Sequence, residues 1–141
     1  MKVVLLLAGV YNLVWGGIVV LAPGWSFGVL GVDPDALDAM TLAIWQCVGM
    51  IVGMYGIGYL VAARNPIRHW PIVLVGFLGK VFGPIGFAKA VFVDEIFPLR
   101  FGWTIVTNDL IWWIPFAMML VCAWRHHQTD RRNGIGEGSD G

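Results

Sequence analysis

Two charged residues, Lys80 and Asp109, each lie inside a long apolar stretch of the sequence. A charged side chain near the middle of a bilayer costs at least about 2.5–3.5 kcal/mol, so it normally faces the protein interior and finds a partner. An ammonium group and a carboxylate that face each other in such a place can bind a small molecule, a quinone head group or a proton. We predict that Lys80 and Asp109 form a pair, either directly or through water.

The expected depths of the two residues agree with pairing. Counted along a helix from Pro71, Lys80 lies about 14 Å from one face of the membrane, and Asp109, counted from Trp103, lies about 9 Å from the other face. Across a hydrocarbon layer about 30 Å thick, the two residues differ in depth by about 7 Å. The flexible lysine side chain can cover most of that distance.

Other strongly polar residues fall at similar depths. Asn12 is level with Lys80, and Gln46 is level with Asp109. The predicted intramembrane polar cluster comprises Asn12, Gln46, Lys80, Asn108 and Asp109. The cluster has two main interpretations: a hydrogen-bonded core that fixes the order of the helices, and a polar cavity that opens outward and binds a ligand. A third is that one of the groups faces a partner subunit. Because desolvation offsets most of the attraction in a buried ion pair, stability alone is a weak reason for such a cluster.

Four apolar stretches, 3–22, 41–63, 71–93 and 103–124, must position these residues. A helix of about 20 residues is about as long as the hydrocarbon layer is thick, and in lipid the backbone must satisfy its own hydrogen bonds. Apolar residues make up 58% of the chain and charged residues 13%. The predicted fold is all-α: an integral membrane four-helix up-down bundle over residues 1–127, followed by a disordered polar tail over 128–141.

Charges in the segments that connect the stretches alternate in sign. Basic residues precede the first stretch, follow the second and follow the fourth, whereas the 23–40 segment carries three aspartates and no basic residue. Basic residues are retained in the cytoplasm, so both termini should be cytoplasmic in a multi-pass protein of the bacterial inner (plasma) membrane. The net charge of zero shows no nucleic-acid signature. The expected partners are the lipid bilayer and either other membrane subunits or further copies of the chain.

Glycines recur at helical spacing in two of the stretches. Gly49 and Gly53 form a small-x-x-x-small pair, which permits the close approach of two helices. The third stretch has a stripe of glycines spaced three, four and three residues apart, which we expect to pack against the second stretch or against another copy of the chain. This stripe comprises Gly76, Gly79, Gly83 and Gly86.

The cysteines and histidines do not suggest a catalytic or metal centre. Cys47 and Cys122 should differ in depth by about 18 Å, whereas the Cα atoms of a disulfide lie about 4.4–6.8 Å apart. Both cysteines are expected to fill space in the core. The three histidines lie at the membrane margin, where they do not suit a haem held between helices. We predict no catalytic residue, no metal and no bound cofactor. A quinone is the one redox-active molecule that we consider as a ligand.

Several segments carry a resemblance to known proteins: 11–16, 46–50, 68–76 and 107–113. These segments are similar to those of a group of small, uncharacterised bacterial four-span membrane proteins, and the layout resembles the broader DoxX-like class. The first stretch lacks the lysine found there in DoxX-type proteins. The resemblance implies a four-helix bundle and a role near quinones or redox enzymes.

Three function classes follow from these observations. The first is an accessory protein or subunit of a membrane complex, which binds its partners through the glycine faces. The second is a carrier of a small molecule or proton that uses Lys80 and Asp109. The third is a component of a quinone-linked membrane oxidoreductase. We favour the first class and a role that is not enzymatic.

Overall fold

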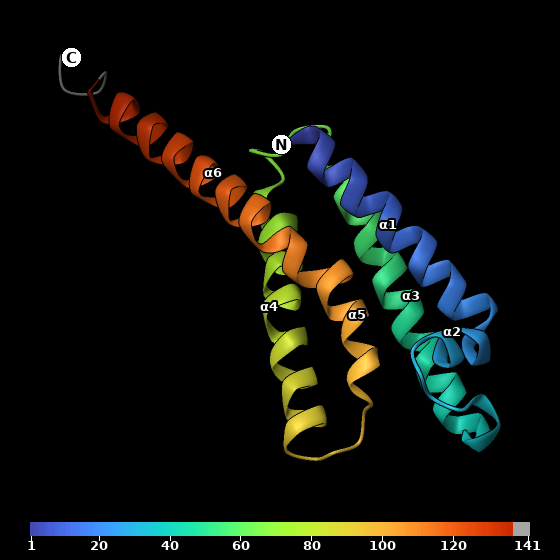
Figure 1. The fold of residues 1–141 in the computed structure, drawn as a ribbon. Helices are drawn as coiled ribbons and strands as arrows, with labels where there is room; N and C mark the ends of the chain where they lie inside the picture. Colours follow the sequence, from blue (N-terminus) through green and yellow to red (C-terminus); the bar gives the residue numbers. More distant parts are fainter. Residues whose placement is uncertain (137–141) are drawn as a thin grey trace.

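The computed structural model describes residues 1–136, and its regular structure in that range is entirely helical (Figure 1). Four helical segments are long and apolar enough to cross a membrane: Lys2–Leu21, Ala39–Ala62, Trp70–Phe92 and Leu99–Thr129. The predicted all-α fold class is therefore confirmed, and each of the four predicted stretches lies in a helical segment that is long and apolar enough to cross a membrane. The fourth span begins earlier and ends later than predicted.

The helices α1 (Lys2–Leu21) and α3 (Ala39–Ala62) pack side by side along their length. Glycines make this contact close. A Cβ atom added to Gly16 would lie 2.5 Å from the carbonyl oxygen of Gly49, and one added to Gly56 would lie 2.8 Å from the carbonyl oxygen of Gly9. Only residues without side chains allow two helix backbones to approach in this way.

The segment between α1 and α3 contains the short helix α2 (Pro23–Val29) and a 3-10 turn (Pro34–Ala36). Trp25 is exposed, whereas Phe27 is buried and belongs to a core cluster. Asp38 caps α3 by accepting a hydrogen bond of 2.6 Å from the backbone N–H of Thr41. A hydrogen bond from the Thr41 side chain, together with this one from the Thr41 backbone, lowers the pKa of Asp38.

The second half of the chain contains α4 (Trp70–Phe92) and a segmented fourth span. That span runs through a 3-10 turn (Leu99–Phe101), α5 (Gly102–Ile105), a π-helical turn (Val106–Leu110) and most of α6 (Ile111–Gly136). In Figure 1, the loop that joins α3 to α4 lies near the N-terminus, and the loop that joins α4 to α5 lies at the opposite end.

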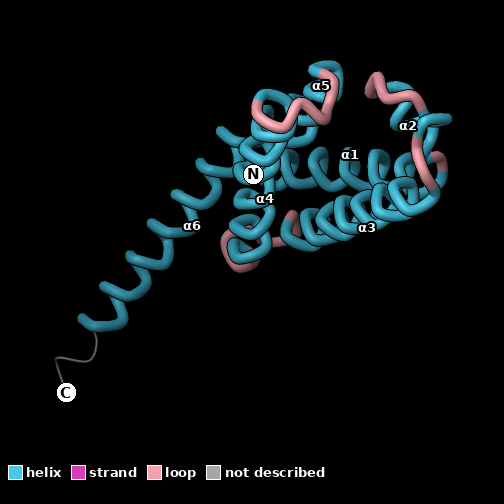
Figure 2. The backbone as a smooth tube through the Cα atoms, turned by 90° about the horizontal axis from the view of Figure 1, so that it is seen from below, coloured by secondary structure: helices cyan, strands magenta, loops and turns pink. Residues whose placement is uncertain are grey.

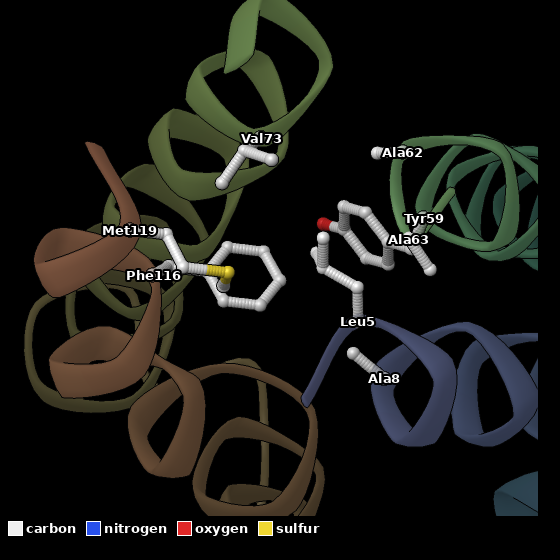
Figure 3. Packing of buried hydrophobic residues seen from close by; sticks show 8 residues of the cluster. All are labelled: Leu5, Ala8, Tyr59, Ala62, Ala63, Val73, Phe116 and Met119. Atoms are coloured by element: carbon white, nitrogen blue, oxygen red, sulfur yellow. The ribbon is translucent and has the colours of Figure 1, made fainter. Parts of the chain in front are cut away.

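Two apolar clusters hold the four spans together at different levels. The first, drawn in Figure 3, joins α1, α3, α4 and α6, with the ring of Tyr59 packed edge-on against Phe116 at a centroid distance of 5.1 Å. The second lies at the α2 end and is built from Phe27, Leu30 and Phe101. On α1, Asn12 lies between Ala8 of the first cluster and Trp15, which packs against the second; on α4, Lys80 lies between Val73 of the first cluster and Phe87, which packs against the second.

The last helix extends beyond the apolar part of the chain. Figures 1 and 2 show α6 running away from the other helices, and it continues to Gly136. Residues 128–136, which belong to the predicted disordered tail, are described as a continuation of this helix. The backbone hydrogen bonds of a helix can continue past the membrane, and Arg and Gln are good helix formers. The rest of the predicted tail, residues 137–141, lies outside the described residues.

Candidate functional site

Lys80 of α4 and Asp109 of the π-helical turn face each other in the interior. Only 3% of Lys80 and 6% of Asp109 is exposed. The Nζ atom of Lys80 lies 3.8 Å from Oδ1 of Asp109 and donates a hydrogen bond to the backbone carbonyl of Asn108. The side-chain amide of Asn108 donates to Oδ1 of Asp109 at 3.0 Å. The ammonium group thus contacts both a carboxylate and a backbone dipole of the facing span.

Both helices are irregular where they carry these residues. Pro84 has no N–H group, so the carbonyl of Lys80, four residues earlier, lacks its usual helical donor. The indole Nε1 of Trp113 donates to that carbonyl at 2.8 Å. On the other helix, the π-helical turn contains Asn108 and Asp109, and π-bulges are frequent at functional sites.

A cavity of about 170 Å³ adjoins the Lys80–Asp109 pair. Asn12 of α1 and Tyr55 and Tyr59 of α3 line one part of it. The Nζ atom of Lys80 lies 5.7 Å from the centre of the Tyr59 ring, within the range of a cation–π interaction. The cavity is therefore bounded by three of the four spans and by the π-helical turn of the fourth.

Two polar atoms near this cavity have no hydrogen-bond partner in the described part of the chain: Oδ1 of Asn12 and Oδ1 of Asn108. Both belong to residues that line the cavity. A buried polar atom without a partner loses the free energy of its hydration, about 1–3 kcal/mol. These two acceptors are therefore available to a ligand or water that carries hydrogen-bond donors.

The structure brings four of the five predicted cluster residues to one cavity: Asn12, Lys80, Asn108 and Asp109. Gln46 is not among them, because its Nε2 atom donates to the carbonyl of Val20 at 2.8 Å. Sequence reasoning missed Tyr59 and Trp113. The spacing of Tyr55 and Tyr59 by four residues, which places both on one face of a helix, was the available signal for the first.

The predicted packing glycines have different surroundings. Gly49 lies against α1, and Gly76 lies directly under the ring of Tyr59. A Cβ atom on Gly83 would lie 3.3 Å from Oδ2 of Asp109, so this glycine makes room for the carboxylate.

The other predicted glycines have more open surroundings. Cβ atoms on Gly53 and Gly86 would meet nothing within 4 Å, and one on Gly79 would only touch the Tyr55 hydroxyl. The stripe on α4 therefore borders the cavity more than it packs against α3.

The cysteines differ from the sequence-based expectation. Cys47 and Cys122 are free thiols, and both are exposed instead of filling the core. In the described residues, no three His, Cys, Asp or Glu side chains are grouped so that they could hold a metal ion.

The fold and site define a helical protein with four candidate membrane spans and a polar centre. Compared with protein-family models, curated proteins and solved structures, the chain matches none of them.

Proposed function

We propose that this chain is a multi-pass membrane protein that binds the polar head group of a small, membrane-soluble molecule in the cavity beside Lys80 and Asp109. The observation that carries the proposal is a buried ion pair beside a cavity. Two residues that line this cavity, Asn12 and Asn108, each have an oxygen that could accept a hydrogen bond from a ligand. Buried charges within a membrane are expensive and usually mark a ligand or ion pathway. Irregular backbone at this depth is likewise tolerated where it lines a cavity.

The size of the cavity limits the ligand. Pockets for drug-sized molecules have volumes of about 300–1,000 Å³, so about 170 Å³ suits a head group or a very small molecule. Gly79 and Gly83 line the cavity and are also exposed on the surface of α4. We propose that the ligand enters between α3 and α4 from the bilayer, with its apolar part left in the lipid.

A quinone or quinol head group has the complementary chemistry. Lys80 can donate a hydrogen bond to a quinone carbonyl oxygen. The carboxylate of Asp109 and the free oxygen of Asn12 can accept hydrogen bonds from quinol hydroxyls. This ligand class is compatible with a carrier and with a component of a quinone-linked oxidoreductase, and binding is the step common to both.

Binding of a short-chain quinone and its quinol to the protein in lipid nanodiscs tests the proposal, with quenching of tryptophan fluorescence as the readout. We expect Lys80→Met to weaken binding at least tenfold, because a charge-assisted hydrogen bond is lost. Lys89→Met is the matched control, since Lys89 is an exposed lysine of the same helix. Equal affinity of the Lys80→Met and Lys89→Met variants, each folded by circular dichroism, would disprove the proposal.

We further propose an up-down bundle in the bacterial inner membrane with both termini cytoplasmic. The positive residues of the 63–70 loop and the acidic residues of the 31–38 segment support this orientation. In a variant without Cys47 and Cys122, a cysteine placed by Arg68→Cys should react with an impermeant reagent only in opened cells. A cysteine placed by Glu95→Cys should react in intact spheroplasts. The reverse pattern would overturn the orientation.

A second candidate function, that of an accessory subunit, is favoured by Gly86. This glycine is exposed, and a Cβ atom there would meet nothing within 4 Å. A neighbouring membrane helix could therefore approach α4 closely at this point. Gly86→Leu should then abolish co-purification of a partner from the native membrane, whereas Gly17→Leu, an equally unobstructed position on α1, should not. Identical co-purification by both variants would exclude this surface.

A further inference from the structure

A second, larger cavity lies far from the Lys80–Asp109 pair, at the end of the bundle where α4 begins. It has a volume of about 1170 Å³ and lies in the angle between α4 and the diverging part of α6. We call it the α4–α6 cleft. Its principal lining residues are Trp70, Leu74, Leu120, Val121, Trp124 and Arg125, with His127 and Gln128 beyond them.

The lining of the α4–α6 cleft changes from apolar to polar along the helices. Leu74 lies about 6 Å further into the span than Trp70, and on α6 the apolar pair Leu120 and Val121 precedes Arg125 by about one turn. Tryptophans such as Trp70 typically mark the boundary between hydrocarbon and head groups. The cleft therefore crosses that boundary, with hydrocarbon contacts on one side and hydrogen-bond donors on the other.

The polar end of the cleft is suited to an anion. The Arg125 side chain is exposed and makes no ion pair with any side chain described in residues 1–129. No carboxylate is among the cleft's described lining residues. Two more arginines, Arg64 and Arg68, lie exposed in the loop that precedes α4. A guanidinium group forms paired hydrogen bonds with phosphate oxygens, and nearby basic residues add to the attraction.

From this combination we infer that the α4–α6 cleft binds one anionic phospholipid, with its phosphate at Arg125 and its acyl chains along Leu74, Leu120 and Val121. The volume agrees with this occupant, because it exceeds the range of about 300–1,000 Å³ found for drug-sized ligands. A soluble anion would leave the apolar part of the cleft unfilled. The bound lipid would also fill the angle between α4 and α6, which no other described part of the chain fills.

Native mass spectrometry of the full chain, released from nanodiscs that contain phosphatidylglycerol and phosphatidylcholine in equal amounts, tests this inference. We expect one retained phosphatidylglycerol per chain. Arg125→Gln should lower its retention about fivefold relative to phosphatidylcholine. Arg64→Gln is the matched control, because it removes an exposed arginine at the same end of the bundle but outside the cleft. Retention of phosphatidylglycerol by Arg64→Gln should fall much less than by Arg125→Gln, because Arg64 adds only long-range attraction from outside the cleft.

A second variant tests the apolar part of the cleft without changing its charge. Val121→Trp should fill the cleft and reduce retention of the lipid, whereas Met118→Trp, at an exposed position of α6 outside the lining, should not. Inorganic phosphate, which has the oxygens but no acyl chains, should not displace the lipid. If Arg125→Gln and Arg64→Gln lost phosphatidylglycerol equally, the inference would be overturned, because the lipid would then be held by the general positive charge of the surface. A dimer that retains no lipid would assign the cleft to a second copy of the chain.

Discussion

The indole N–H of Trp113 donates a hydrogen bond of 2.8 Å to the backbone carbonyl of Lys80. The usual donor to that carbonyl is missing because the residue four positions later is Pro84. The side chain of one span thus completes the backbone hydrogen bonding of another, at the residue whose ammonium group contacts Asp109. This contact fixes α4 and α6 relative to each other at the level of the cavity.

Removal of this indole donor should destabilise the protein. Trp113→Phe leaves the carbonyl of Lys80 buried without a partner, and we expect the free energy of unfolding to fall by about 1–3 kcal/mol. The measurement is SDS titration of the protein in mixed micelles. Trp103→Phe is the control, because Trp103 is exposed and its side chain makes none of the described hydrogen bonds.

A double-mutant cycle distinguishes the hydrogen bond from the loss of ring volume. Pro84→Ala restores an N–H group that can donate to the carbonyl of Lys80. In that background, Trp113→Phe should cost at least about 0.5 kcal/mol less than in the natural sequence, because residues in contact are energetically coupled. Costs that are equal in both backgrounds would refute the proposed role of the indole donor.

The Lys80–Asp109 pair should respond very differently to single and double substitution. Lys80→Met leaves a buried carboxylate without its cation and should lower the free energy of unfolding by about 3–5 kcal/mol. Lys80→Met combined with Asp109→Leu removes both charges, and we expect stability close to that of the natural sequence or above it. SDS titration of the three proteins provides the comparison.

The exposed pair Lys89–Asp94 is the reference for this experiment. Its Nζ–Oδ2 distance is only 2.5 Å, yet 64% of the Lys89 side chain is exposed. Lys89→Met should therefore change the free energy of unfolding by no more than about 1 kcal/mol. If Lys80→Met were as mild as Lys89→Met, the buried pair would have no structural role.

Two features could be predicted from the sequence: which segments form the long apolar helices, and that Lys80 and Asp109 face each other. Each depends on one dominant free-energy term. Hydropathy and length determine which segments can cross a membrane. The cost of a charge in lipid turns both charged side chains inward. Depth alone also predicted that Asn12 lies level with Lys80, and both line the cavity.

Depth did not predict the rotation of each helix about its axis. Gln46 was expected near Asp109, but its helix turns it toward the carbonyl of Val20 on α1. The position of Gln46 depends on how α1 and α3 pack, and many weak contacts determine that packing. The sequence also gave no sign that Trp113 would complete the backbone hydrogen bonding of α4, since a partner for a free carbonyl depends on the arrangement of both helices.

The pH dependence of the α3 cap follows from the lowered pKa of Asp38. Because the folded pKa lies below the unfolded value of about 3.8, the ionised cap stabilises α3 above that value. The stabilisation is lost as the pH falls through the folded pKa. Hydrogen exchange at the Thr41 amide should therefore show less protection at pH 3 than at pH 6, after correction for intrinsic exchange. Asp38→Asn, a capping residue that does not ionise, should remove this dependence.

The close contact between α1 and α3 predicts that an added methyl group at Gly16 will destabilise the protein. A Cβ atom on Gly16 would lie 2.5 Å from a backbone oxygen of Gly49, and a backbone atom cannot move aside as a side chain can. Gly16→Ala should therefore separate the two helices and lower the free energy of unfolding by about 1–3 kcal/mol. Gly17→Ala, one residue later and with nothing within 4 Å of the added atom, should leave stability unchanged or slightly raised. SDS titration of both variants provides the measurement, and equal effects would show that α1 and α3 do not approach each other along the face that contains Gly16.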